Sequence, residues 1–341
     1  MAFAIYSVEV KMTKLRVGVI GCGAMGTHLA NQCASLPNAE VIAMCDIVRE
    51  RADKLAEAFK AKSFTKYKSL LKKGDVDAVI VATPNNSHAK ITIDSARAGK
   101  HIFCEKPMAL TLKECDAMIA AAKKAGVMLM VGQVLRLFPV FWRTKQIIAS
   151  GELGKPFGMF VQRTGQADAF RHKTWRGYRK SCGGLLLEIN AHELDFMRFI
   201  LGEATEVYAQ MGNFCSPESE IEDLAFVTIK FASRAIAILH SSTAVSIGEY
   251  RNTIQCAEGT LTNGGFGGPI QYQRNGGEVV TIEASEIEKP EPYQDELASF
   301  VNTITTGSPM VFDARDGRAA VELALAAYRS AKTGKAVKLP L

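Results

Sequence analysis

The sequence predicts an α/β protein in two parts: a doubly wound parallel sheet, followed by a second α/β unit built on a large, mostly antiparallel, open sheet. Two observations support the first part. Short apolar segments alternate with helical segments over the first 131 residues, and the first apolar segment runs directly into a glycine-rich turn. After Gly132 the segments become longer, alternate polar with apolar residues, and are joined by Gly, Asn and Ser turns, which favours antiparallel strands.

The first element is a strand that leads into the glycine-rich turn. Residues 15–20 are apolar on both faces and rich in Val and Ile, as expected for a buried strand. The segment Gly21-Cys22-Gly23-Ala24-Met25-Gly26 follows at once, and residues 25–36 are predicted to form a helix. A Gly-x-Gly-x-x-Gly turn in this setting is typical of dinucleotide binding, because the amides and positive end of the helix face the phosphates.

Each glycine of this turn has a physical role. Gly21 lets the chain turn sharply, Gly23 lets a pyrophosphate approach the backbone, and Gly26 lets helix and strand pack closely. The second predicted strand, 40–45, ends in Asp46, where a ribose-binding carboxylate is expected. The predicted dinucleotide site therefore includes Gly21, Gly23, Ala24, Met25, Gly26 and Asp46. We expect NAD rather than NADP, since this carboxylate would repel a 2′-phosphate.

The rest of the first part continues the alternation. Helices are expected at 49–60, before Lys72-Lys73-Gly74, up to Ala98, and at 111–125; strands are expected at 78–82, 101–104 and 127–131. Such segments form a parallel sheet with helices on both faces, and loops at the carboxyl ends of its strands hold the ligand. Those loops add further predicted cofactor-binding residues: Thr83, Pro84, Asn85, His88, Glu105 and Lys106.

The second part starts with helices and continues with strands. Helices are expected at 139–150 and from about Gly184, with a strand at 157–162 and a basic loop between them. Later strands are expected at 205–210, 225–232, 236–242, 252–258, 270–274 and 279–283, and closing helices at 294–306 and 316–333. We expect an N-terminal arm (1–13), a dinucleotide-binding domain (14–131), and a substrate-binding and oligomerisation domain (132–341) whose last helix could pack back on the first domain.

The sequence of the predicted second sheet also indicates that the protein forms an oligomer. Residues 235–239 are apolar on both faces of their strand. Because one layer of helices covers only one face of a sheet, a second, partly apolar face indicates a partner subunit. We expect a homodimer or homotetramer.

Composition narrows the class of protein. Hydrophobic residues make up 48% and charged residues 22%, which is typical of a globular protein. The net charge of +6 without a dense Lys/Arg block argues against nucleic-acid binding, and no apolar run is long enough to span a membrane. Eight scattered cysteines without a CxxC pair favour reduced thiols in the cytoplasm. Residues 1–13 do not have the pattern of a signal peptide.

Lys106 is the first candidate catalytic residue. A lysine in a loop is usually only solvated. This one lies at the ligand edge of the predicted sheet, and Pro107 fixes the backbone beside it. Its ammonium group could therefore donate to a substrate hydroxyl and stabilise a developing alkoxide.

A second candidate group follows Gly183-Gly184. Glu188 and His192 are four residues apart, so we expect them on one face of the predicted helix, with Asp195 three residues further on. A histidine here could be a satisfied core residue, or half of a metal site. The second His of a zinc-protease helix is missing, because position 196 is Phe196. We therefore expect no metal.

A basic run precedes this helix. It contains Trp175 and Tyr178 among the cations Arg171, His172, Lys173, Arg176, Arg179 and Lys180. The run could be a solvated loop, or a substrate wall in which Trp175 packs against a sugar face and the cations bind hydroxyls or an anionic group. Nucleic acid is a weaker third alternative.

These motifs together resemble one family. The set comprises Gly21-x-Gly23-x-x-Gly26, Thr83-Pro84-Asn85-x-x-His88, Glu105-Lys106-Pro107, Trp175-Arg176 and Gly183-Gly184…His192-x-x-Asp195. From about residue 14 to its end the chain resembles the glucose–fructose oxidoreductase/inositol dehydrogenase (Gfo/Idh/MocA) family. The resemblance implies a Rossmann domain, a C-terminal α/β domain whose open sheet mediates oligomers, and NAD(P)-dependent oxidation of sugars or cyclitols. Glu188 stands where the family usually has Asp, and Cys182 where a further glycine is common.

The resemblance also implies catalytic roles. It implies that Lys106 and His192 are catalytic and that His192 carries the proton. We assign His192 as general base, Lys106 as the donor that stabilises the alkoxide, and Glu188 as a group that orients the substrate or His192. The expected substrate contacts are Lys106, Arg136, Trp175, Arg176, Glu188 and His192. Three alternatives are a non-catalytic nucleotide-dependent sensor, a methyltransferase, and elimination or hydrolysis through a transient oxidation. The sensor is disfavoured because both Lys106 and His192 are present. The methyltransferase is disfavoured by the Glu105-Lys106-Pro107 motif and by the large second domain.

Overall fold

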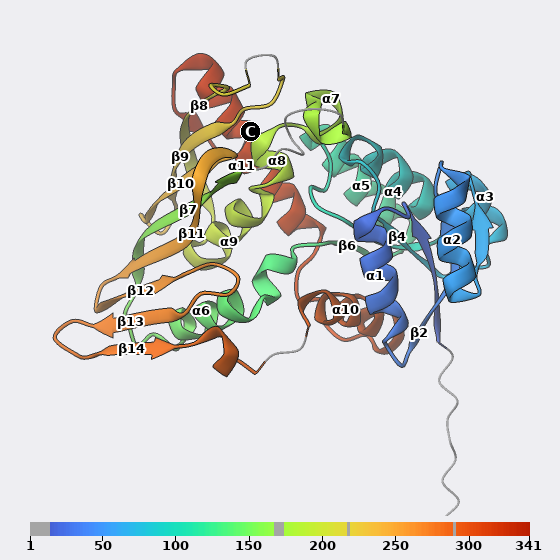
Figure 1. Cartoon of the computed structure of the whole chain (residues 1–341), viewed down its shortest axis with the longest axis horizontal. Helices are drawn as coiled ribbons and strands as arrows, with labels where there is room; N and C mark the ends of the chain where they lie inside the picture. Colours follow the sequence, from blue (N-terminus) through green and yellow to red (C-terminus); the bar gives the residue numbers. More distant parts are fainter. Residues whose placement is uncertain (1–13, 167–173, 217–218, 289–290) are drawn as a thin grey trace, which may run out of the picture.

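Two sheets lie side by side with helices between them in the computed structural model (Figure 1). The structure describes residues 14–166, 174–216, 219–288 and 291–341. The predicted N-terminal arm and three members of the basic run, Arg171, His172 and Lys173, lie outside the described residues.

The first sheet has six parallel strands in the order β3-β2-β1-β4-β5-β6, which confirms the predicted parallel sheet. The strands are β1 (Leu15–Ile20), β2 (Ala39–Cys45), β3 (Lys62–Phe64), β4 (Ala78–Val81), β5 (His101–Cys104) and β6 (Leu129–Val131). The helices are α1 (Ala24–Ala34), α2 (Arg49–Phe59), α3 (Tyr67–Lys73), α4 (His88–Arg97) and α5 (Leu112–Ala125). The strand order reverses between β1 and β4, and this reversal opens a crevice at the carboxyl ends of the strands.

The second sheet has nine strands in the order β14-β13-β12-β11-β7-β10-β9-β8-β15. Its strands are β7 (Pro156–Gln166), β8 (Ala204–Gly212), β9 (Leu224–Phe231), β10 (Ile236–Ser242), β11 (Ala244–Cys256), β12 (Gly259–Asn263), β13 (Ile270–Arg274), β14 (Val279–Ile282) and β15 (Val337–Lys338). Only β7 and β10 pair in parallel, so the prediction of a mostly antiparallel sheet is confirmed.

One face of this sheet packs on helices and the other is open. The helices α6 (Pro139–Ser150), α9 (Ala191–Leu201) and α11 (Ala314–Thr333) lie on the side that faces the first sheet (Figure 1). In β10, Ala237 and Leu239 are fully buried on that side. Ile236 and Ile238 point the other way and remain 49% and 40% exposed. The strand is therefore apolar on both faces, as its sequence indicated.

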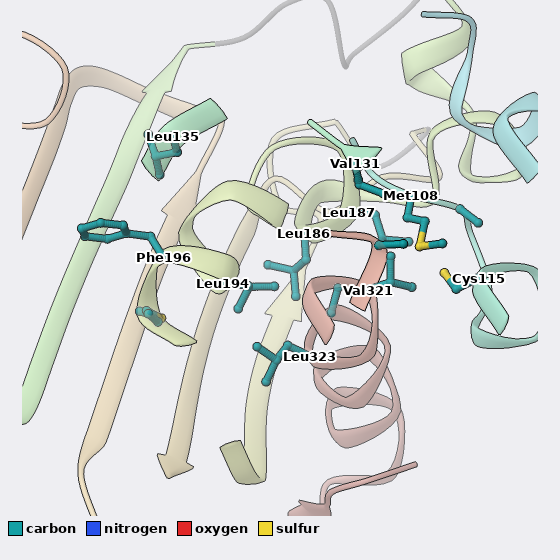
Figure 2. Packing of buried hydrophobic residues seen from close by; sticks show 14 of the residues in the cluster. Met108, Cys115, Val131, Leu135, Leu186, Leu187, Leu194, Phe196, Val321 and Leu323 are labelled. Atoms are coloured by element: carbon teal, nitrogen blue, oxygen red, sulfur yellow. The ribbon is translucent and has the colours of Figure 1, made fainter. Parts of the chain in front are cut away.

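The two closing helices return to the first part of the chain. Phe300 of α10 (Pro292–Thr306) packs edge-on against Phe103 of β5, with ring centroids 5.9 Å apart. The amide of Asn38, just before β2, donates to the side-chain oxygen of Asn302 at 2.9 Å. Figure 2 shows Val321 of α11 near Met108 and Val131, and all three side chains belong to one buried cluster, so this helix packs on the first part of the chain.

The predicted helix after Gly184 is interrupted. Three short elements replace it: α7 (Arg179–Cys182), α8 (Leu185–Glu188) and, after Ile189 and Asn190, the longer α9. Asn190 leaves helical geometry at φ −97° and ψ 6°, and its side chain donates to Glu193 Oε2 at 3.0 Å. The prediction that Glu188 and His192 share one face of a continuous helix is therefore wrong.

In the described segments, none of the helices combines the length and the apolar composition that crossing a bilayer requires.

Candidate active site

The glycine-rich turn between β1 and α1 has one open position and two crowded ones. A Cβ added to Gly21, which has a φ of +100°, would lie 2.4 Å from the Ala82 carbonyl oxygen. One added to Gly26 would lie 1.7 Å from the Gly21 carbonyl oxygen, whereas one at Gly23 would meet no atom within 4 Å. Gly21 and Gly26 thus serve packing, while Gly23 faces open space. The N-terminus of α1 has no side-chain cap and no acidic residue in its first turn, so its amides suit a phosphate.

Asp46 stands beside this turn at the end of β2. Its Oδ2 accepts from the backbone N–H of Cys22 and its Oδ1 from that of Val48, each at 2.8 Å. These bonds fix the carboxylate next to the turn, and each oxygen keeps a lone pair for a ribose hydroxyl. The turn and this carboxylate together fit a dinucleotide.

The loop after β4 is tied to its neighbours. It carries Thr83 and Pro84, then the short helix η1 (Asn85–Ser87). The His88 ring is buried, with Nε2 2.8 Å from the Thr83 carbonyl oxygen and Nδ1 2.8 Å from that of Pro107. Asn85 donates from Nδ2 to Glu188 Oε2 at 2.6 Å and to the Cys182 carbonyl at 2.9 Å. These contacts join the loop to the β5 loop and to the second part of the chain. The predicted contact of this loop with the cofactor stays a prediction.

Lys106 reaches from the end of β5 to the second part of the chain. Its Nζ donates to the carbonyl oxygen of Glu188, the last residue of α8, at 2.7 Å. Its own backbone N–H donates to Glu105 Oε2 at 3.0 Å. The ammonium group is therefore held at the junction of the two parts.

The Glu188 side chain is buried and fully engaged. Oε1 accepts from Arg176 Nε at 2.7 Å, and Oε2 accepts from Asn85. Arg176 is in η4 (Trp175–Gly177), and its guanidinium lies 4.6 Å from the centre of the Trp175 ring. Among the contacts of the described residues, Glu188 orients Arg176 and Asn85, and no hydrogen bond joins it to His192.

His192 lies in the first turn of α9, partly exposed. Its Nδ1 is buried and has no hydrogen-bond partner within the described part of the chain. Burial, followed by the positive charges of Lys106 and Arg163, holds the pKa of His192 well below its usual value of 6.5. The imidazole is thus neutral at neutral pH and free to accept a proton.

A buried network that the sequence reasoning missed supports α9. Glu193 is 1% exposed, and its Oε1 accepts from Arg163 Nη1 at 2.7 Å and from the Tyr250 hydroxyl at 2.5 Å. Arg163 Nη1 also donates to the Ile189 carbonyl at 3.3 Å, in the break between α8 and α9. Arg163 comes from β7 and Tyr250 from β11, so no spacing in the sequence links them to His192.

Arg136 and Asp195 form a buried ion pair with each other. Arg136 Nε and Nη2 donate to the two carboxylate oxygens of Asp195 at 2.6 and 2.5 Å, and Asp316 lies 3.0 Å from Nη2. Arg136 is 6% exposed and stacks 4.5 Å from the centre of the Phe199 ring. These contacts hold α9 against the 3₁₀ helix η2 (Val134–Leu137). The predicted contact of Arg136 with the substrate stays a prediction.

Two family models match the chain. "Oxidoreductase family, NAD-binding Rossmann fold" matches residues 15–133, and "GFO/IDH/MocA C-terminal domain" matches residues 141–262. The chain belongs to the Gfo/Idh/MocA oxidoreductase family. As a member of this family it carries an NAD-binding Rossmann domain, and the glycine turn and Asp46 lie in the matched segment.

Similar proteins act on sugars and cyclitols. The myo-inositol 2-dehydrogenase of Thermotoga maritima is 28% identical, over 95% of this chain and 98% of that protein. The 2,7-anhydro-N-acetylneuraminate hydratase of Mediterraneibacter gnavus is 30% identical, over 73% of this chain and 67% of that one. The crystal structure of an aldose-aldose oxidoreductase from Caulobacter crescentus with glycerol has a TM-score of 0.86 and 28% identity, covering 96% of this chain and 100% of that one.

By its family the chain is an NAD-binding oxidoreductase. Over the described residues, no group of three or more His, Cys, Asp or Glu side chains could hold a metal ion.

Proposed function

We propose that the protein transfers a hydride between the nicotinamide of NAD and a secondary hydroxyl of a sugar, sugar derivative or cyclitol. One observation carries the proposal. Lys106, from the first part of the chain, and His192, from the second, lie close enough for the ammonium charge to act on the imidazole. Lys106 follows the end of β5, a strand of the NAD-binding sheet, and reaches the Glu188 carbonyl of the second part.

Alcohol oxidation requires the chemistry that these two side chains offer. A secondary alcohol is far too weak an acid to ionise at neutral pH, so the departing proton needs a base. The neutral imidazole of His192 accepts it, and the Lys106 ammonium donates a hydrogen bond that stabilises the alkoxide. Bound NAD supplies a hydride acceptor. Glu188 keeps Arg176 and Asn85 in place beside the reacting group.

The related proteins support both the substrate class and one alternative. An inositol dehydrogenase and an aldose-aldose oxidoreductase favour a polyhydroxylated substrate. The similarity to a hydratase favours, as a second function, elimination or hydration through a transient oxidation. In that reaction NAD is restored in every cycle, so the substrate changes while NADH does not accumulate.

The test combines binding with a substrate panel. NADH fluorescence titration establishes binding, and polyols, aldoses, glycosides and uronates are then supplied with NAD. We expect NADH absorbance to rise with at least one cyclitol or aldose. Substrate consumption without net NADH would support the hydratase-type reaction. NADH binding with no substrate consumed by either measure would contradict both and favour a non-catalytic sensor.

We further propose a cytoplasmic location. All eight cysteines are unpaired, and seven of them are buried. Unpaired thiols throughout a chain of this size are typical of a reducing compartment.

A further inference from the structure

Buried polar atoms without a partner among the described residues gather between α10 and the end of β6, in a small space called the pocket below. Glu296 of α10 is fully buried, and neither of its carboxyl oxygens has a hydrogen-bond partner among the described residues. Gln133 lies two residues after β6 and is 1% exposed. Both polar atoms of its side-chain amide likewise have no hydrogen-bond partner among the described residues. Folded proteins seldom leave such groups unsatisfied, so the pocket calls for a functional explanation.

Glu105 reaches the same pocket from the other side. A Cβ added to Gly132 would lie 3.5 Å from Glu296 Oε1 and 3.6 Å from Glu105 Oε1. The two carboxyl groups therefore approach the same small space, which exists because position 132 carries no side chain. Glu105 is also buried, and its Oε2 accepts from the Lys106 backbone N–H.

Among the described residues, no cation is bonded to this pair. The Lys106 ammonium is bonded to the Glu188 carbonyl, Arg136 of η2 to Asp195, and Arg163 of β7 to Glu193. The other titratable groups close to the pair are Glu291, the N-cap of α10, and Tyr293 of α10, and His28 of α1 contacts both of these.

Two buried carboxyl groups without a bonded cation cannot both ionise. Burial raises the pKa of Glu105 to about 7. Burial and the Glu105 charge raise the pKa of Glu296 well above its usual value. The pair therefore retains a proton at neutral pH.

The strand order separates this pair from the glycine turn. The turn follows β1 and Asp46 follows β2, and these residues would hold the pyrophosphate and the adenosine ribose. Glu105 follows β5 and Gln133 follows β6, on the other side of β1, where the nicotinamide half of a bound dinucleotide would extend.

We propose that Glu105 and Glu296 share one proton, and that this proton is released when NAD⁺ binds but not when NADH binds. In this role Glu296 is a positioning residue. The reason is charge. The nicotinamide ring of NAD⁺ is cationic and favours an ionised carboxylate nearby, whereas that of NADH is neutral. Gln133, with an amide that both donates and accepts, can hydrogen-bond either form of the pair. The inference depends on NAD binding and not on the identity of the substrate.

The proposal determines how the affinity for each cofactor depends on pH. If NAD⁺ binding releases a proton, NAD⁺ binds more tightly as the pH rises, by at most tenfold per pH unit when a full proton is released. NADH affinity should be independent of pH over the same range. The two cofactors would thus differ in pH dependence although they occupy the same site.

The experiment is calorimetry on the full-length protein. NAD⁺ and NADH are titrated in buffers of different ionisation enthalpy, from about pH 6 to about pH 8.5, in the range around the pKa of the pair. Wild type should release a substantial fraction of a proton with NAD⁺ and none with NADH. Glu296→Gln keeps the shape of the side chain but cannot share the proton, so the release and the pH slope should be lost while NADH affinity stays within about twofold. Glu57→Gln, the same substitution at an exposed position of α2, is the matched control and should keep the release.

Any of three results would overturn the proposal. One is equal proton release with NAD⁺ and NADH in wild type, a comparison that requires no variant to fold. Another is unchanged release in Glu296→Gln. Loss of NADH binding in that variant would also contradict it, because it would show a general structural role for Glu296.

Discussion

At the scale of single residues, the proposed role of His192 as general base gives the first prediction. We expect His192→Ala to lower kcat by roughly 10²- to 10⁴-fold, the usual contribution of a positioned acid–base group. NAD binding should be nearly unchanged, because the glycine turn and Asp46 lie elsewhere. Steady-state kinetics on the true substrate, with NADH fluorescence titration as the binding control, would test this.

A variant of Lys106 can be compared with His192→Ala. Lys106→Ala should be at least as damaging, since it removes the group that stabilises the alkoxide. Near-full kcat in His192→Ala would identify another base, and Glu188 would be the next candidate.

The surroundings of His192 also predict the pH profile. Burial and the charges of Lys106 and Arg163 lower its pKa, so the neutral, proton-accepting form persists to low pH. At saturating NAD⁺, kcat/KM for the alcohol should therefore fall only well below pH 6.5, as the imidazole becomes protonated. A loss of activity centred above that pH would show that a different group titrates.

Asp46 predicts the choice of cofactor. Its carboxylate is fixed by the Cys22 and Val48 amides, so it would face a 2′-phosphate without room to turn away. NAD(H) should bind more tightly than NADP(H), and Asp46→Ser should narrow the difference. Fluorescence titrations of both reduced cofactors would measure it. Tighter NADP(H) binding to wild type would contradict the role of Asp46.

At the scale of elements, the glycine turn offers a matched pair of variants. Gly26→Ala would place a methyl group against the Gly21 carbonyl, so β1 and α1 must move apart and the melting temperature should fall. Gly23→Ala meets no atom of the protein, so stability should be kept while NADH affinity falls by about tenfold or more, as for a lost phosphate approach of about 1.4 kcal/mol. Thermal denaturation and NADH titration of both variants would separate packing from binding. If Gly26→Ala and Gly23→Ala lowered the melting temperature equally, the assignment of Gly26 to packing and Gly23 to cofactor binding would be refuted.

Elements with a strong apolar pattern could be predicted from the sequence, and those without a pattern of their own could not. β1 and β5 consist mainly of apolar residues, and their predicted ends match those in the structure. β3, with the sequence Lys-Ser-Phe, and β15, with two residues, gain their structure from a neighbouring strand and have no periodicity of their own. β12 was missed because it begins at Gly259 and ends at Asn263, residues that usually indicate turns.

The site shows the same limit. Glycines and loop ends are local signals, and they indicated the phosphate turn, Asp46 and Lys106. The partners of Glu193 come from β7 and β11, so only the folded sheet brings them together. The break at Asn190 was missed because four-residue spacing predicts a shared face only where the helix is continuous.

At the scale of the whole molecule, the open face of the second sheet predicts an oligomer. Phe226, Ile236 and Ile238 are 47%, 49% and 40% exposed there, and we propose that they are covered in a homodimer or homotetramer. Ile238→Asp should shift the protein towards monomer in light scattering at micromolar concentration. Ile47→Asp, equally apolar but 92% exposed in a loop far from this sheet in sequence, is the control. A monomeric wild type would contradict the proposal.

The return of α10 to the first sheet sets the order in which the chain can fold. Leu297, Phe300 and Val301 complete the same core as β1 and α1, although nearly the whole chain separates them. During synthesis the ribosome delivers the glycine turn first, but its supporting helix emerges almost last. The N-terminal part must therefore wait, with part of its apolar surface uncovered, until the second part has been made. Synthesis and folding thus run in different orders, and a ribosome that stalls before residue 292 leaves the cofactor domain without its final layer.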